Sequence, residues 1–182
     1  TYPVSRIEVL LGKLFAHLAI LALALATGYG IAAAAALSVD PEAIAGLPSL
    51  WRLMWSSVLL GATFLGVGYA ISALARRSSG AAGLAIGIWL GLIVLYDLGL
   101  LAAIVADNGG VFTTSFFPLA LLANPADAFR LFNLAASQAT SAAAGVSGAA
   151  TSIPIWASLT SILVWPLAAL AFATAAFRKV IP

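Results

Sequence analysis

The sequence predicts an all-α protein, a polytopic bundle of transmembrane helices, from three observations. Hydrophobic residues make up 63% of the 182 residues and charged residues only 8%, against roughly a quarter charged in ordinary soluble domains. The mean hydropathy is +1.12. The apolar residues gather in four runs that each reach the length of about 20 residues that a membrane-spanning helix needs. Helices are the expected form because the lipid core offers backbone groups no hydrogen-bond partner.

The four predicted spans lie within a single permease domain that covers residues 1–182. The spans are residues 14–37, 53–75, 81–105 and 153–177. After the first span, Pro41, Gly46 and Pro48 predict a break in the helix, and Trp51 marks a membrane interface beyond it. The short hairpin "ARRSSG" joins the second and third spans.

Basic residues predict the orientation of these spans. Four spans place the start of the chain, the "ARRSSG" hairpin and the C-terminal end on one side of the membrane. The basic residues on that side are Arg6, Lys13, Arg76, Arg77, Arg178 and Lys179. The other side has only Arg52 and Arg130, so the side rich in basic residues is predicted to be cytoplasmic. The net charge of +2 is too small to indicate a nucleic-acid partner.

The connection over residues 107–152, on the predicted outer side, is expected to hold a re-entrant or interfacial segment. Its first part, "VFTTSFFPLALLA", is apolar but too short to span the membrane. A helix should follow, with Asn124 as its N-cap, Pro125 at its first position and Asp127 near its positive end. This helix, which also carries Arg130, is expected either to lie among lipid headgroups or to form a docking surface for an outer partner.

Small residues recur every four positions in two of the spans. They are Ala62, Gly66 and Ala70 in the second span and Gly83, Gly87 and Gly91 in the third. Small residues on one helix face allow backbones to approach closely in a membrane. The pattern therefore predicts helix packing, either within the chain or, for the glycines of the third span, with a second copy of the chain.

Asp97 is an ionisable residue inside the third predicted span. A carboxylate at that depth is costly and is a candidate for function by default. Two interpretations stay open: a protonated or hydrogen-bonded carboxyl in a helix contact, with Tyr96 or a nearby hydroxyl, or a role in the movement of ions or protons.

The sequence offers no set of residues for catalysis or for binding a metal ion. With no cysteine, one histidine and one methionine, His17 and Met54 form no recognisable ligand set for copper, zinc or iron. Ser147, in "GVSG", resembles the nucleophile of rhomboid proteases, but it lies in the outer connection, whereas His17 lies near the cytoplasmic end of the first span. No phosphate-binding glycine loop ending in Lys-Ser or Lys-Thr occurs, so a nucleotide would be bound by another chain.

The first residues, "TYPVSRIEVLLGKLFAH", predict a short amphipathic helix that leads into the first span. Ser5 and Glu8 have the spacing of a capping box, and Arg6 and Lys13 flank an apolar stripe. From the residues alone, a basic anchor among the lipid headgroups would explain this segment equally well.

Two stretches resemble a known family. "YPVSRIEVLLGKLFAH" resembles the cytoplasmic segment before the third membrane helix in permease subunits of type-2 ABC exporters. "LLANPADAFRLFNL" resembles the outer stretch of the NosY branch of that family. The family has six spans, and the four predicted here correspond to its third to sixth. The chain is therefore expected to be a fragment that lacks its N-terminal part.

This resemblance implies a multi-pass subunit of the bacterial inner membrane that works with two other proteins. One is a cytoplasmic ATPase similar to NosF, which would bind ATP and Mg, so that this chain would carry no cofactor and no catalytic residue. The other is a periplasmic β-helical protein similar to NosD. The process implied is maturation of the copper centre of nitrous-oxide reductase, with two copies of the permease in the complex.

The resemblance also implies roles for particular residues. The segment over residues 3–13 would couple to the ATPase. Its coupling residues would be Val4, Ser5, Arg6, Glu8 and Lys13. The residues carried over to the surface for the periplasmic partner are Asn124, Asp127 and Arg130.

Three other functions stay open. The chain could belong to a conventional exporter of a sulfur species, a lipid or a small hydrophobic molecule, to an ion-coupled transporter that uses Asp97, or to a structural anchor. Passage of copper through the four spans would call for soft ligands along them, and these do not recur. Transmission of a conformational change is therefore favoured over a copper conduit.

Overall fold

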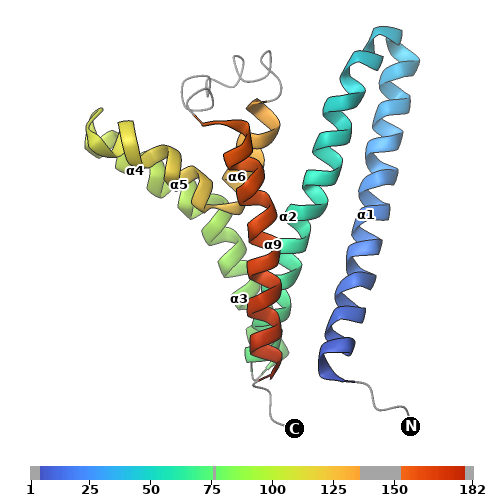
Figure 1. Cartoon of the computed structure of the whole chain (residues 1–182), viewed down its shortest axis with the longest axis vertical. Coiled ribbons are helices and arrows are strands. Elements are labelled where there is room, and N and C mark those ends of the chain that lie inside the picture. The colour runs from blue at the N-terminus through green and yellow to red at the C-terminus, as the bar shows by residue number, and fades with distance from the viewer. Residues whose placement is uncertain (1–4, 76, 136–152, 179–182) are drawn as a thin grey trace. The chain divides into compact units, whose positions relative to one another are not determined.

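The computed structural model describes residues 5–75, 77–135 and 153–178, which are helical almost throughout and include no strand (Figure 1). Four helices in this part of the chain are long and apolar enough to cross a membrane. They are Ile7–Val39, Pro41–Leu74, Ser78–Asp107 and Ile155–Arg178. The predicted all-α class and its four spans are confirmed. The first three helices begin before their predicted apolar runs, because long side chains such as those of Lys13 and Arg52 can carry their charges toward water from helix ends.

Contacts within the chain group it into two compact units. The first comprises Thr1–Leu74 and Pro166–Pro182, and the second comprises Ala75–Trp165. The last helix, α9 (Ile155–Arg178), contributes to both, because the boundary falls at Pro166 inside it. Proline has no N–H group, so α9 lacks one helical hydrogen bond at this boundary.

The first unit begins with α1 (Arg6–Val39), a single unbroken helix of 34 residues. Its start is fixed by the predicted capping box: the Glu8 N–H donates to Ser5 Oγ at 3.3 Å, and the Ser5 N–H donates to Glu8 Oε2 at 2.7 Å. The amphipathic segment at the start leads into the membrane span, as predicted, and the two form one continuous helix. The apolar periodicity alone gives no boundary between the two.

The connection after α1 is also more helical than predicted. It is a short 3-10 helix, η1 (Pro41–Gly46), which passes directly into α2 (Leu47–Leu74). Asp40 caps η1, since its Oδ1 accepts from the Glu42 N–H at 2.9 Å. Both prolines of the predicted break lie in the first turn of a helix, where the missing N–H group costs nothing.

The core of the first unit includes a close contact between α2 and the second half of α9. Gly66 and Ala70 are buried, and Ala70 packs with Ala173 and Ala176. A Cβ built on Gly66 would lie 2.8 Å from the Cβ of Ala169. The small residues of the second span therefore pack within the chain, as the sequence predicts for Gly66 and Ala70.

The second unit contains the third span, which is interrupted by a wider turn. The span consists of α3 (Ser78–Leu90), a π-helical turn η2 (Gly91–Leu95) and α4 (Tyr96–Asp107). After a tight turn at Asn108 and Gly109, both with positive φ, the predicted apolar segment forms η3 (Phe112–Phe116) and α5 (Phe117–Ala123). These fold back along α4 (Figure 1). The re-entrant or interfacial placement of this segment stays a prediction. The last element before the undescribed stretch is α6 (Pro125–Ala135).

The glycines of the third span, Gly83, Gly87 and Gly91, form a glycine ladder that has open space beside it among the described residues. A Cβ built on Gly83, Gly87 or Gly91 would meet no described atom within 4 Å, and the most apolar window of this span is 0% buried within the chain. No packing partner for the ladder lies within the described part of the second unit. Its role in helix packing, with a second copy or otherwise, stays a prediction.

Candidate functional site

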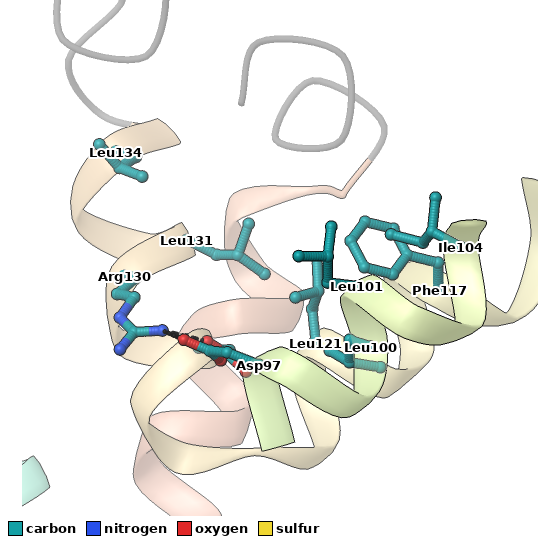
Figure 2. Close-up of a pocket in the computed structure, with 10 residues that line it drawn as sticks. Asp97, Leu100, Leu101, Ile104, Phe117, Leu121, Arg130, Leu131 and Leu134 are labelled. Carbon is teal, nitrogen blue, oxygen red and sulfur yellow. Dashed lines mark hydrogen bonds and ion pairs between the residues drawn. The ribbon is translucent and has the colours of Figure 1, made fainter. Parts of the chain in front are cut away.

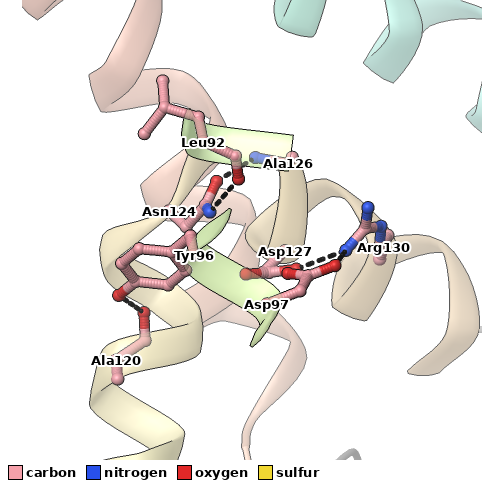
Figure 3. Close-up of polar contacts among 8 residues, drawn as sticks. All are labelled: Leu92, Tyr96, Asp97, Ala120, Asn124, Ala126, Asp127 and Arg130. Atoms are coloured by element: carbon pink, nitrogen blue, oxygen red, sulfur yellow. Dashed lines mark hydrogen bonds and ion pairs between the residues drawn. The ribbon is translucent and has the colours of Figure 1, made fainter. Parts of the chain in front are cut away.

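Asn124 fixes the start of α6 and ties it to the third span (Figure 3). Its Oδ1 accepts from the Ala126 N–H at 2.9 Å, which confirms the predicted N-cap. Its Nδ2 donates to the carbonyl oxygen of Leu92 at 2.7 Å, inside the π-helical turn η2. Because the Asn124 side chain is fully buried and uses both ends of its amide, it sets the position of α6 against the third span.

A second bond holds α5 against the same turn of the span. The Tyr96 hydroxyl donates to the carbonyl oxygen of Ala120 at 2.7 Å (Figure 3). Tyr96 directly follows η2, and its N–H bonds to the Gly91 carbonyl five residues earlier. The wider turn therefore lies where α5 and α6 are both attached, and π-helical turns are frequent at functional sites.

An ion-pair cluster lies beside these bonds. Arg130 Nη1 donates to Asp97 Oδ2 at 2.6 Å and to Asp127 Oδ1 at 2.7 Å (Figure 3). The side chains of Arg130 and Asp97 are 43% and 40% exposed, whereas that of Asp127 is only 5% exposed. The cluster links α4 to α6 across 33 positions of the chain, and it holds two acids against one base.

Asp127 has an unusual environment for a carboxylate. Its Oδ2 is buried and accepts no hydrogen bond from the described residues. Burial raises the pKa of Asp127 to about 6, the nearby Asp97 carboxylate adds to this effect, and Arg130 opposes it. The side chain thus holds one buried oxygen without a donor from the described residues, which is costly.

A cavity of about 270 Å³ opens at this cluster (Figure 2). Its polar part consists of Asp97, Asp127 and Arg130. The rest of its wall is apolar and comes from α4, α5 and α6: Leu100, Leu101, Ile104, Phe117, Leu121, Leu131 and Leu134. The charged groups therefore lie at one side of a pocket that is otherwise lined by hydrocarbon.

The first half of α9 and Ile153, two residues before it, contact α5 and α6. Leu131 packs with Ile153 in a small buried cluster, and the Ser161 hydroxyl donates to the carbonyl oxygen of Leu122 at 2.6 Å. The helices that carry the cluster are thus held together by side-chain bonds and by apolar contacts.

Comparison with known proteins identifies the family. The sequence matches the family model described as "ABC-2 family transporter protein" over residues 1–180. The chain belongs to the ABC-2 transporter family. Two relatives are described as probable ABC transporter permease protein NosY. The one from Pseudomonas aeruginosa is 43% identical over 183 residues, and the one from Stutzerimonas stutzeri is 40% identical over 185 residues.

These alignments cover 98% of the chain and 66% of each relative, so the chain spans about two thirds of the length of these permeases. The resemblance to NosY-like permeases inferred from the two sequence stretches is confirmed. The chain is accordingly part of a multi-pass ABC-2 permease.

The residues predicted to face an outer partner differ in accessibility. Asn124 and Asp127 are buried and hold α6 in place, whereas Arg130 is partly exposed. Of the three, only Arg130 offers surface to another molecule in the described part of the permease. Their partner role stays a prediction, and the structure gives the two buried residues a positioning role.

The predicted coupling residues lie in the first unit of the permease. Ser5 and Glu8 form the cap of α1, Arg6 is its first residue, and Lys13 is exposed about two turns further on. Val4 lies outside the described residues. The coupling role of all five stays a prediction.

His17 packs against an aromatic side chain of α2. Its ring makes an edge contact with Tyr69, whose hydroxyl lies 2.6 Å from Nδ1. Both side chains belong to the first unit. Among the described residues, no three His, Cys, Asp or Glu side chains gather into a group that could hold a metal ion. Ser147 lies outside the described residues.

Sequence reasoning singled out Asp97 and Arg130 but did not pair them. The pairing needs the α4–α5 hairpin to close and α6 to begin at a fixed place, and neither can be read from periodicity. A usable signal was nevertheless present: an acid within a span calls for a partner, and the predicted outer side holds only two basic residues, Arg52 and Arg130.

Proposed function

We propose that this ABC-2 permease couples ATP hydrolysis by a cytoplasmic ATPase to a conformational change at the opposite face of the membrane, in the assembly of the copper centre of nitrous-oxide reductase. The observation that carries the proposal is the start of α1. A capped helix end with an exposed basic residue, Lys13, continues without a break into a membrane span. A partner that moves this end moves the span itself.

The length of α1 makes it suitable for such transmission. At a rise of about 1.5 Å per residue, its 34 residues extend over roughly 50 Å. The helix packs along α2, with Tyr29 and Ser57 in hydrogen-bond contact. Binding of nucleotide to a partner can shift a two-state arrangement only if the two states differ in their contacts with that partner. The capped start of α1 is a defined element whose contacts with the partner can differ between the two states.

The composition supports transmission over passage of copper. The chain has no cysteine, one histidine and one methionine, whereas a path for copper ions would call for repeated soft ligands. An ATPase on one side and an outer partner on the other are the partners that this role requires. A second copy of the permease is a further partner that the open glycine ladder can accommodate.

Site-specific crosslinking tests the coupling. The complete permease, with its proposed ATPase partner, is reconstituted in nanodiscs after Lys13→Cys is introduced, and a thiol-reactive photocrosslinker is attached. We expect crosslinks to the ATPase whose yield changes when a non-hydrolysable ATP analogue is added. The matched control is Ile44→Cys in η1, which is also exposed but lies beyond the other end of α1, and it should give no such crosslink. Absence of any Lys13 crosslink to the ATPase in the assembled complex would overturn the proposal.

The copper-centre role is tested in cells. A strain without the permease gene is complemented with the intact gene or with a gene whose α1 start is uncoupled by Ser5→Ala together with Glu8→Ala. We expect nitrous-oxide reductase from the second strain to lack the absorption bands of its assembled copper centre, although the permease is present in the membrane. Full copper-centre spectra in both strains would contradict the role. ATP-dependent accumulation of a sulfur compound or lipid in inverted vesicles would favour a conventional exporter.

A further inference from the structure

We propose that Tyr69 is a positioning residue that passes a displacement of α1 to α9, with His17 as its contact on α1. The inference rests on the coupling role proposed for the start of α1 and deepens it, because it names the path that the displacement takes within the first unit. Three observations carry it: the face that α1 turns to α2, the two hydrogen-bond contacts of His17, and the packing of the Tyr69 ring.

One face of α1 connects its capped start to α2, which lies beside it (Figure 1). Leu10 and Leu14 are buried, with 1% and 6% of their surfaces exposed. His17 and Leu21 follow them at spacings of three and four residues, so all four lie on the same side of the helix. Leu21 packs directly against Gly61 of α2, where a Cβ would overlap its Cδ2. A displacement of the start of α1 therefore reaches the contact with α2 along one unbroken helix face.

His17 Nδ1 lies within hydrogen-bonding distance of two oxygen atoms. One is the carbonyl oxygen of Lys13, about one turn closer to the start of α1, at 2.8 Å. The other is the hydroxyl oxygen of Tyr69 in α2, at 2.6 Å. The ring thus bridges the backbone of α1, at a residue expected to couple to the ATPase, and a side chain of α2.

The two contacts compete for one nitrogen atom. A carbonyl oxygen can only accept, so the bond to Lys13 requires a hydrogen on Nδ1, and the Tyr69 oxygen can then only share that hydrogen. If the Tyr69 hydroxyl donates to Nδ1 instead, this nitrogen carries no hydrogen for Lys13. His17 therefore has two bonding arrangements, and a displacement of α1 relative to Tyr69 changes the balance between them. A partner that binds the two arrangements differently can bias such a two-state element.

The ring of Tyr69 packs on a cluster that joins α2 to α9. This buried cluster consists of Ala70 in α2 and of Ala173 and Ala176 in the second half of α9. Ala70 and Ala173 are 0% and 1% exposed, and closely packed interiors transmit a displacement because they compress little. Tyr69 thus contacts α1 with its hydroxyl group and the cluster that includes α9 with its ring.

Fluorescence of the assembled complex tests this path. The complete permease and its proposed ATPase partner are reconstituted in nanodiscs, with an environment-sensitive fluorophore on Leu167→Cys, an exposed position of α9 next to Pro166. We expect a non-hydrolysable ATP analogue to change the emission in the otherwise intact permease. In Tyr69→Phe, the response should fall about three- to tenfold, the equivalent of one net hydrogen bond.

Tyr29→Phe is the matched control. It removes the same hydroxyl group from the same pair of helices, because the Tyr29 oxygen lies 3.4 Å from Ser57 Oγ of α2, but Tyr29 lies about three turns beyond His17 along α1. Its emission response should equal that of the intact permease. A second pair of variants tests the other side of the contact: His17→Asn keeps a polar atom where Nδ1 lies and should retain most of the response, whereas His17→Leu should lose it as Tyr69→Phe does.

The Lys13→Cys crosslink to the ATPase separates failure of this path from failure of the coupling role. If that crosslink changes with nucleotide, any of four results would overturn the role of Tyr69: no emission response in the otherwise intact permease, a full response in Tyr69→Phe, an equal loss in Tyr29→Phe, or an equal loss in His17→Asn and His17→Leu. If the crosslink yield does not change with nucleotide, the coupling role fails and the path fails with it. Equal Tm values for Tyr69→Phe and Tyr29→Phe would show that the loss of response does not come from a loss of folding.

Discussion

The contact between α2 and α9 allows a sharp prediction for one methyl group. A Cβ on Gly66 would lie 2.8 Å from the Cβ of Ala169, 3.1 Å from its carbonyl carbon and 3.3 Å from its oxygen. Carbon atoms in good contact are about 3.5–4.0 Å apart. Two of these three atoms belong to the backbone, so no side-chain rotation relieves the overlap, and Gly66→Ala must push the two helices apart.

The magnitude follows by comparison with a neighbouring glycine. Gly68 is in the same helix, and a Cβ there would meet nothing within 4 Å among the described atoms. Both substitutions gain the same helix propensity, about 1 kcal/mol, which cancels between them. The overlap at Gly66 should cost about 1–3 kcal/mol. Gly66→Ala is therefore expected to be less stable than Gly68→Ala by about 1–3 kcal/mol.

Thermal unfolding in detergent micelles measures this difference. For a protein of this size, each kcal/mol corresponds to about 2–4 °C in Tm, so Gly66→Ala should unfold roughly 3–10 °C below Gly68→Ala. Because the two variants have the same composition and differ only in the position of the methyl group, effects of detergent and of the unfolded state are matched. An equal or higher Tm for Gly66→Ala would refute the close packing of α2 on α9.

Three other predictions concern the second unit. The pKa of Asp127 is about 6 in the folded protein, above its ordinary value. The stability gained from the protonated form of Asp127 is therefore fully present below the ordinary pKa and is lost as the pH rises through about 6. The Tm of Asp127→Asn should rise relative to that of the intact chain between about pH 4 and about pH 7, by the equivalent of about 2–3 kcal/mol. Parallel profiles of Tm against pH for the two proteins would contradict this. Asn124→Ala removes the cap of α6 and the donor to the Leu92 carbonyl, and it should lower the free energy of unfolding by about 2–3 kcal/mol in a denaturant titration. An unchanged midpoint would argue against a stabilising role for the two hydrogen bonds of Asn124. Gly87→Leu places a large side chain on the glycine ladder, which no described atom contacts. If a second copy of the permease packs there, as proposed, size-exclusion chromatography with light scattering should show a dimer for the intact permease and its loss in this variant; a dimer that persists in the variant would contradict packing at the ladder.

The parts of the fold that the sequence predicts well are those set by local chemistry. The four spans follow from the lengths of their apolar runs. The caps at Ser5 and Asn124 follow from residue type and spacing, because a cap joins groups only two or three positions apart. The break after the first span was predicted as longer than it is, because Pro41 and Pro48 lie where a helix tolerates proline.

The parts of the site that the sequence does not predict depend on contacts between distant positions. The ion pair of Arg130 with Asp97 requires the chain to turn back after α4 and α6 to begin at one particular residue. The sequence of Gly91–Leu95 is purely apolar and does not indicate that this stretch forms a π-helical turn. Asp127, placed in the first turn of α6 by its helix-end preference, acquires a raised pKa only because that turn is buried beside a second acid.

Pro166 lies between two halves of α9 that make contacts in different units of the chain. The first half of α9 contacts the second unit through Ser161 and Ala157, and its second half packs on α2 through Ala169. Each half is thus fixed within its own unit, while the residue between them lacks a helical hydrogen bond. A helix bends most easily where a bond of its ladder is absent. A bend in α9 is therefore expected at Pro166, between the bond of Ser161 to Leu122 and the contact of Ala169 with Gly66.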